Sequence, residues 1–214
     1  MVPIYSSNPA AEFSPHERQR LLEIALRSIQ SGLDGQQYPK LDPASLPATL
    51  CAYRASFVTL ESGGTLRGCI GSLQPLSMLA DDVSHNAWAA AFRDPRFSPL
   101  QAAELDALTI RVSVLGEREE MQFDSEQALI KQLRPGRDGL ILQEHTHKGT
   151  FLPSVWDSLP EPADFLIHLK LKAGLPAHYW SDSMQAWRYA TESFGASVAA
   201  LRHSGATHAV EMLK

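Results

Sequence analysis

The sequence predicts an α+β fold built on a mostly antiparallel sheet. Three observations support this class: a hairpin-like stretch at residues 51–73, a clean apolar–polar alternation at residues 108–115, and segments with helical spacing between the predicted strands. Hairpins separated by helices are typical of antiparallel α+β folds, whereas doubly wound folds alternate single strands with single helices.

The first helix is predicted to start after Ser14. Pro15 occupies the first helical position, and Glu17 completes a capping box with Ser14. Gly32 is expected to end the helix, and residues 1–13 are expected to form an extended N-terminal arm. The helical spacing is carried by five apolar residues, Leu21, Leu22, Ala25, Leu26 and Ile29.

Residues 51–73 are predicted to form a hairpin around the turn sequence ESGG. With the loop at residues 62–64, Glu61 faces Thr65, and Cys69 lies near Phe57 on the partner strand. Cys51 is then far from Cys69 along the ladder. A disulfide between the two cysteines is therefore not expected.

A second helix and a strand follow the hairpin. Leu76, Leu79 and Val83 open a helical pattern that ends before the prolines of RDPRFSP, and acidic residues stand near its N-terminus. In the sequence LTIRVSVL, apolar residues at 108, 110, 112 and 114 alternate with polar ones. This alternation indicates a half-buried strand.

The second half of the chain repeats this order. A short helix near residues 125–133, strands in LILQ and TFLPSVW, a helix ended by Gly174 and a last strand in MQAWRYATESF are predicted. Helix, hairpin, helix and strand thus occur twice. The pattern indicates one domain over residues 14–195, with pseudo-repeats of about 14–115 and 116–195, and a C-terminal tail at residues 196–214.

Composition excludes several classes of function. Of 214 residues, 44% are hydrophobic and 20% charged, with a formal net charge of −5 and no basic stripe, so nucleic acid is not an expected partner. No apolar run approaches the roughly 18 residues that span a bilayer. The N-terminus has no signal-peptide pattern, and two cysteines are too few for a disulfide framework, so a cytoplasmic location is expected. No glycine-rich nucleotide loop is present, and no cofactor is expected.

Five segments, in order, carry a resemblance to a known family. They are LRGCIGSL (66–73), AAFRDPRFSPL (90–100), VSVL (112–115), GRDGLIL (136–142) and FLPSVW (151–156). Together they resemble the AMMECR domain family, whose prokaryotic members are often called AmmeMemoRadiSam system protein A. The resemblance implies two fused repeats around a single, strongly curved, barrel-like sheet. It implies no established activity, and it implies a Memo-type protein and a radical-SAM protein as partners in one gene system.

Cys69, within LRGCIG, is the candidate catalytic residue. Arg67 lies on the same face of a regular strand, and a neighbouring positive charge favours the reactive thiolate. Gly68 and Gly71 would let a ligand or another backbone approach closely. In the alternative interpretation, Cys69 is a small buried hydrophobic residue and the glycines form a bulge or bend. No histidine stands at a defining spacing, and His85 is the best available partner.

The RDPRF segment supplies the other candidate binding residues. Arg93 and Arg96 flank Asp94, and guanidinium groups suit carboxylate or phosphate ligands. Together with Arg67 they would surround an anionic ligand, with Asn86 on the preceding helix at its border. In the alternative interpretation, Asp94 pairs with an arginine and Phe97 fills the core, so that the segment latches a loop.

His145 and His147 are two residues apart, as in the first half of some metal sites. They fall in a predicted turn with no third ligand at a useful spacing, so no metal site is expected. The sequence therefore predicts an accessory or binding module. Its cleft, formed by residues 67–71 and 86–97, would hold a small anionic ligand or a segment of a partner. The alternative function is a thiol-dependent enzyme with Cys69 as nucleophile or redox residue.

Overall fold

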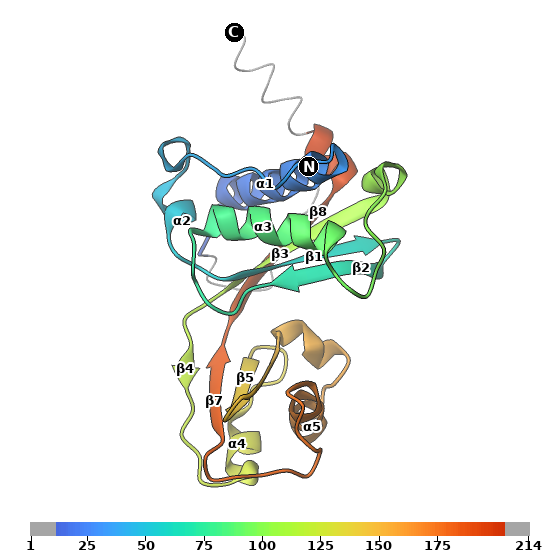
Figure 1. Ribbon diagram of the computed structural model, residues 1–214. Coiled ribbons are helices and arrows are strands. Elements are labelled where there is room, and N and C mark those ends of the chain that lie inside the picture. Colours follow the sequence, from blue (N-terminus) through green and yellow to red (C-terminus); the bar gives the residue numbers. More distant parts are fainter. Residues whose placement is uncertain (1–11, 204–214) are drawn as a thin grey trace. The chain divides into compact units, whose positions relative to one another are not determined.

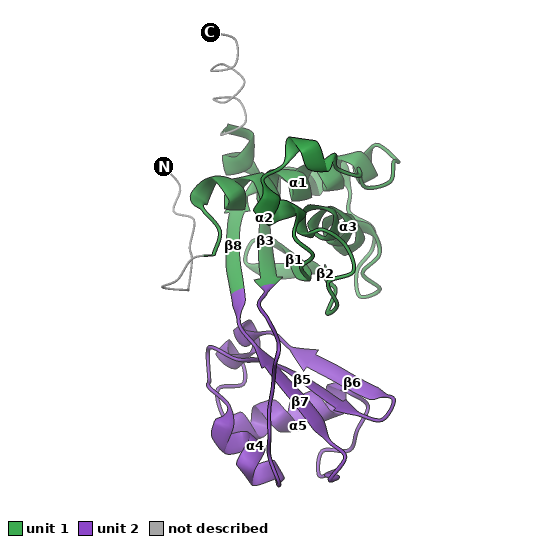
Figure 2. Cartoon of the chain, turned by 90° about the vertical axis from the view of Figure 1, so that its left-hand side faces the viewer, with its two compact units in different colours: residues 1–114, 192–214 green, residues 115–191 purple. Residues whose placement is uncertain are grey.

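A computed structural model describes residues 12–203 of the chain, and these residues divide into two compact units. The first unit contains the chain up to Val114 together with the part from Glu192 onward, and the second contains Leu115–Thr191 (Figure 2). The first unit is therefore completed by residues that follow the whole of the second.

The first unit is a sheet with helices on one side (Figure 1). Its elements are α1 (Pro15–Leu33), η1 (Pro43–Ser45), α2 (Ala48–Cys51), β1 (Ser56–Ser62), β2 (Thr65–Gly71), α3 (Leu79–Phe92), η2 (Ala102–Ala107), β3 (Leu108–Leu115) and β8 (Thr191–Ser197). The strand order in the sheet is β2-β1-β3-β8, with β1 antiparallel to both β2 and β3. A further helical turn begins at Val198.

The second unit contains β4 (Glu119–Glu120), α4 (Glu126–Gln132), β5 (Gly139–Glu144), β6 (His147–Phe151), η3 (Pro153–Asp157), α5 (Pro162–Lys172) and β7 (Gln185–Tyr189). Its strand order is β4-β7-β5-β6. The α+β class with antiparallel sheets is confirmed. The described strands form two four-stranded sheets and close no barrel, so the single barrel-like sheet is not confirmed.

The order helix, hairpin, helix, strand occurs in both units, as α1, β1–β2, α3, β3 and as α4, β5–β6, α5, β7. The three strands of each set also pair in the same order, β2-β1-β3 and β6-β5-β7. The fourth strand of each sheet comes from the chain that leaves the other set: β4 follows β3 but pairs with β7, and β8 follows β7 but pairs with β3.

Local sequence signals explain α1 in detail. The Glu17 N–H donates to the Ser14 hydroxyl, and the Ser14 N–H donates to the Glu17 carboxylate, which confirms the capping box. The prediction that Gly32 ends this helix was wrong, because the helix continues to Leu33. A Cβ on Gly32 would lie 2.1 Å from a ring carbon of Phe92, so this glycine permits close packing of α1 and α3 instead.

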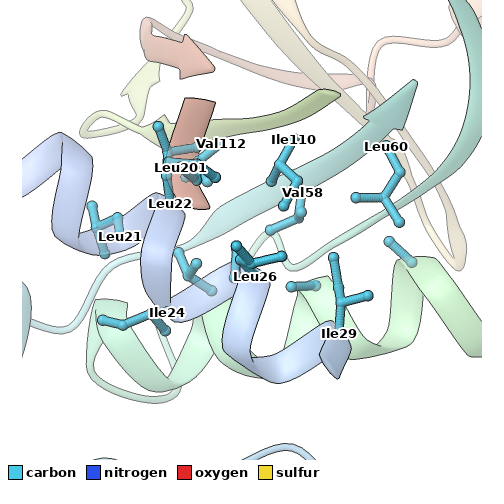
Figure 3. Packing of buried hydrophobic residues seen from close by; sticks show 14 of the residues in the cluster. Leu21, Leu22, Ile24, Leu26, Ile29, Val58, Leu60, Ile110, Val112 and Leu201 are labelled. Carbon is cyan, nitrogen blue, oxygen red and sulfur yellow. The ribbon is translucent and has the colours of Figure 1, made fainter. Parts of the chain in front are cut away.

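The core of the first unit lies between the helices and the sheet. Leu22, Leu26 and Ile29 of α1 gather with strand residues such as Val58 and Ile110 (Figure 3). Burial of each of these side chains contributes about 1.5–3 kcal/mol. Phe13, expected in a loose arm, is also buried here. A separate core fills the second unit, where the Trp156 and Phe165 rings stack with centroids 3.8 Å apart.

Three further expectations need correction. Cys69 pairs with Thr59 and not near Phe57, because a register shift between Leu60 and Glu61 and a two-residue turn at Gly63 and Gly64, both with positive φ, displace the ladder. The segment 153–157 was predicted as part of a strand, but it forms the 3₁₀ helix η3. Pro153 explains the difference, because it has no N–H to donate to a neighbouring strand. The last predicted strand is two strands, β7 and β8, which belong to different sheets.

No helix among residues 12–203 is long and apolar enough to cross a membrane. Both cysteines are free, as the sequence predicts: the thiol of Cys51 lies 3.6 Å from the carbonyl oxygen of Pro43, away from the β1–β2 ladder that holds Cys69. The predicted C-terminal tail is described only in part. Residues 198–203 are helical, and residues 204–214 lie outside the described residues. Residues 1–11 of the predicted arm also lie outside them.

Candidate functional site

Strand β2, which carries LRGCIG, lies at the edge of the first sheet, and its outer side is closed by the DPRF segment. The Cys69 N–H donates to the Asp94 carboxylate at 2.8 Å, and Arg96 donates to the Cys69 carbonyl oxygen at 3.3 Å. An unpaired edge strand is a template for unwanted association. The two side chains therefore take the place of a neighbouring strand at this point.

The Asp94 carboxylate is only 4% exposed and also forms a bidentate ion pair with Arg96, at 2.7 and 2.9 Å. The hydrogen bonds from Arg96 lower the pKa of Asp94 to about 2, against the opposing effect of burial, and the Cys69 N–H adds to them. The carboxylate is thus anionic at neutral pH. These contacts match the latch interpretation of the RDPRF segment.

Arg67 is held by a second acidic partner. Its guanidinium donates to both Glu104 oxygens, at 2.7 and 3.1 Å, and to the carbonyl oxygen of Ser98. The hydrogen bond to Glu104 raises the pKa of Arg67. Its Nη1 has no hydrogen-bond partner among the described residues, but that atom is enclosed by protein. Arg67 and Arg96 both lie within 6 Å of the Phe97 ring centroid.

The two glycines of LRGCIG permit close approach of other parts of the protein. A Cβ on Gly68 would lie 2.2 Å from the carbonyl oxygen of Ala90, so this residue lets α3 pack directly on β2. A Cβ on Gly71 would lie 2.2 Å from the ring of Phe57. Of the two approaches that the sequence left open, ligand or protein, the described contacts supply the second.

Among the described residues, the Cys69 thiol has no hydrogen bond to a basic side chain, although the Cys69 main chain contacts Asp94 and Arg96. Because Gly68 faces α3, the alternation of the strand places the Cys69 side chain on the opposite face of the sheet. Its thiol lies 3.3 Å from the Thr59 hydroxyl, a side chain that is not basic. His85 belongs to α3, on the other side, so a Cys69–His85 pair is not formed.

The remaining predicted residues lie apart from this group. Arg93 is exposed and stacks over Trp88, with its guanidinium carbon 5.4 Å from the ring centroid. Asn86 is 2% exposed, and its amide donates to the main-chain carbonyl of Ser56 and to the Asp82 carboxylate. The structure therefore groups Arg67, Asp94 and Arg96 near Cys69 and separates Arg93 and Asn86 from them.

Asn86 is part of a buried polar cluster that orders the end of β2. The Asp82 carboxylate accepts hydrogen bonds from the N–H and hydroxyl of Ser56 at 2.8 and 2.7 Å, from Asn86 at 2.8 Å and from Ser72 at 2.7 Å. Three of these donors bind Oδ2 and the Ser72 hydroxyl binds Oδ1, so both oxygens of this buried carboxylate are hydrogen-bonded. The cluster fixes the start of α3 against the two strands.

A pocket of about 420 Å³ opens beside this cluster. Asp81 and His85, one helical turn apart on α3, face it, and the His85 ring meets Tyr38 edge-on at 4.9 Å. Leu76 borders it with 77% of its surface exposed. The full lining is Tyr38, Lys40, Ser72, Gln74, Leu76, Ser77, Asp81, Asp82 and His85.

His145 and His147 of the second unit contact other groups of the protein. The His147 ring nitrogen Nδ1 lies 3.1 Å from the Ala173 carbonyl, and His145 lies in the turn with a φ of 50° and contacts Glu144 at 3.3 Å. Throughout residues 12–203, no group of three or more His, Cys, Asp or Glu side chains is arranged to hold a metal ion.

The sequence did not predict the pocket beside α3. Asp81, Asp82 and His85 fall at i, i+1 and i+4 of a predicted helix, a spacing that places Asp81 and His85 on one face. That spacing was the available signal. The contributions of Tyr38 and Lys40 had no signal, because they come from an irregular segment some forty residues earlier in the chain.

A family profile, several relatives and a solved structure are similar to this chain over most of its length. The sequence profile described as AMMECR1 matches residues 22–194. A protein from Methanothermobacter thermautotrophicus is 35% identical over 190 residues, covering 86% of this chain and 96% of the relative. The protein MJ0810 from Methanocaldococcus jannaschii is 33% identical over 158 residues, covering 70% and 77%. The crystal structure of the uncharacterised protein PH0010 from Pyrococcus horikoshii is similar, with a TM-score of 0.80 and 30% identity, covering 86% of this chain and 94% of that one.

Proposed function

Because this chain belongs to the AMMECR1 family, whose relatives named above carry no stated activity, we propose its function from its own geometry: an accessory binding module whose pocket beside α3 receives a segment of a partner protein. The observation that carries the proposal is Leu76. This large apolar side chain is 77% exposed and stands at the rim of a concave pocket of about 420 Å³, the kind of surface at which ligands and peptides bind.

The chemistry of the lining favours a peptide segment over an anion. The pocket contains two carboxylates, Asp81 and Asp82, and one ammonium, Lys40. An anionic ligand, one of the two occupants that the sequence left open, is better matched by Arg67 and Arg96, but each of these already pairs with an acidic side chain. A peptide offers an apolar side chain for Leu76 together with N–H and C=O groups for the serine and glutamine side chains of the rim.

The partners that we propose are the Memo-type protein and the radical-SAM protein of the gene system that the family resemblance implies. A cytoplasmic setting is part of this proposal. It is supported by the two free cysteines among the described residues.

The test is a titration of the full chain with each purified partner, by calorimetry. Leu76→Asp is expected to weaken binding at least about tenfold, because a charge replaces the large apolar contact that the pocket offers. The matched control is Leu171→Asp, the same change at a residue of α5 that is 51% exposed, and it should bind like the unchanged chain. Equal weakening by both variants contradicts the pocket, and no binding to either protein contradicts the choice of partners.

One observation keeps the thiol-dependent enzyme as the second candidate: Cys69 is only partly buried. A catalytic thiol needs a nearby base or another source of activation. The thiol contact to Thr59 supplies no base, and the neighbouring Arg96 is already paired with Asp94. Cys69→Ser is therefore expected to fold and to bind the partners normally. A folded Cys69→Ser chain that binds normally but fails to complement a deletion strain would favour the enzyme instead.

A further inference from the structure

The second unit contains a pocket of its own, of about 320 Å³, between the segment before α4 and the segment before β7. Its lining is Phe123, Asp124, Trp180, Ser181 and Asp182. The Phe123 and Trp180 rings have centroids 5.7 Å apart and are inclined at 58°, so the two aromatic faces form an angle at the pocket. No lysine or arginine takes part in the lining.

The two carboxylates of the pocket have no basic partner among the described residues. Asp124 accepts one hydrogen bond, from the neighbouring Ser125 hydroxyl at 3.0 Å. Neither Asp124 nor Asp182 forms an ion pair within residues 12–203, and both are exposed. Two unpaired carboxylates at aromatic faces create a negative potential that no basic residue of the lining compensates.

A third carboxylate lies behind the pocket. Glu144 is 1% exposed, and its Oε1 accepts hydrogen bonds from Ser183 at 2.8 Å and from Tyr179 at 3.1 Å, while its Oε2 has no partner among the described residues. The Ser183 hydroxyl lies 2.7 Å from that of Ser181, which lines the pocket. A hydrogen-bonded chain thus joins the buried carboxylate to the pocket wall.

Glu144 carries its charge at neutral pH. Burial acts to raise its pKa, but hydrogen bonds from Ser183, Ser181 and Tyr179, with the adjacent His145, outweigh burial and lower it. The hydrogen-bonded chain from Glu144 through Ser183 to Ser181 therefore has a negative charge at its buried end. It favours a hydrogen-bond donor with positive charge at the Ser181 end.

We propose that this pocket binds a primary alkylammonium group. A cation near the faces of Phe123 and Trp180 is attracted by the ring quadrupoles, and the two aspartates supply opposite charge. The N–H groups of a primary ammonium can also donate to Ser181. An anion is repelled by all three carboxylates, and a bare metal ion lacks a set of three ligands within the described residues. This site lies in the second unit and does not depend on the proposed function.

Such a group has two sources: a free diamine, or the lysine side chain of a peptide. The experiment uses the full chain labelled with ¹⁵N and follows the indole N–H signals of its four tryptophans, with the Trp180 signal identified by a Trp180→Phe variant. The probes are 1,5-diaminopentane, N-acetyl-lysine amide and uncharged N-acetyl-norleucine amide. We expect a saturable shift of the Trp180 signal with at least one of the two amines and none with the norleucine compound.

Which amine binds identifies the source: the diamine alone indicates a free amine, the lysine compound alone indicates a side chain, and both indicate recognition of the ammonium group itself. Asp182→Asn is expected to weaken binding about two- to fivefold, and Asp124→Asn combined with it more strongly. The control is Asp157→Asn, an exposed aspartate of the same unit outside the pocket. The proposal is overturned if neither amine shifts Trp180, if norleucine amide shifts it equally, or if Asp157→Asn weakens binding as much as the pocket variants.

Discussion

At Asp94, one buried carboxylate binds both a main-chain N–H of β2 and the guanidinium of Arg96. The sequence indicated that an arginine and this aspartate pair, but not that the pair would cover the edge of a strand. The difference matters for the candidate site. Arg67 and Arg96 were expected to bind a ligand, but they bind acidic side chains of the protein itself. Arg67 pairs with Glu104, and Arg96 pairs with Asp94.

The pKa of Asp94 makes a testable statement about stability. Its folded-state value of about 2 is below the ordinary value of 3.8, so its contribution to stability is present above pH 3.8 and is lost as the pH falls toward 2. The contribution is on the order of 2 kcal/mol. Asp94→Asn should therefore lower the free energy of unfolding at pH 7 by about that amount and flatten its dependence on pH between 4 and 2.

Urea denaturation at a series of pH values measures this effect. The control is Asp106→Asn, an exposed aspartate of the same unit, which should retain the difference between pH 4 and pH 2. A chain with Asp94→Asn that loses stability with falling pH as steeply as the unchanged chain would contradict the role given to this carboxylate.

Among the elements, the β1–β2 hairpin shows how glycine positions are decided by neighbours. Gly71 leaves room for the Phe57 side chain, and Gly68 leaves room for the backbone of α3. The sequence showed two glycines in a strand, which indicates close approach without telling what approaches. That information resides in side chains and a helix that fold back from elsewhere in the chain.

This difference predicts a coupling. Gly71→Ala should destabilise the protein by about 1–3 kcal/mol, because its Cβ overlaps the Phe57 ring and approaches the Ser56 carbonyl. In a Phe57→Ala background the same change should be less destabilising by about 1 kcal/mol, since the ring is gone. Gly68→Ala meets only main-chain atoms of Ala90, so Phe57→Ala should give it no relief.

The double-mutant cycle is measured by chemical denaturation of the four chains in each set. Equal coupling of Phe57 to both glycines, or coupling to neither, would show that the overlap at Gly71 is relieved by other movements.

For the whole molecule, the main feature is that the first unit is closed by residues from beyond the second. Strand β8 pairs with β3, and Glu192 at its start accepts hydrogen bonds from Arg18 of α1 at 2.8 Å and from the main-chain N–H groups of Glu12 and Phe13. Both side chains of the Arg18–Glu192 ion pair are less than 10% exposed. A single carboxylate thus ties the two ends of the described chain together.

Glu192→Gln should be strongly destabilising, by about 3–5 kcal/mol, because it leaves the buried Arg18 charge without its counter-charge. The control is Glu61→Gln, which affects the more solvent-accessible pair with Arg111 at 3.7 Å in the same sheet and should change stability by less than about 1 kcal/mol. Thermal and urea unfolding measure both. Similar effects of the two variants would contradict a structural role for the buried pair.

The sequence by itself determined the local elements, the α+β class and the family. A capping box, alternating apolar residues and glycine-rich turns act over a few residues, so they can be read without knowing the fold; the helix α1, the strand β3 and the repeated order of elements follow from them. The tertiary structure alone decided the strand register at Cys69, the exchange of the fourth strands and the pocket that joins Lys40 to Asp81. These depend on which distant segments meet, and that is set by the packing of whole elements and not by any short stretch of sequence.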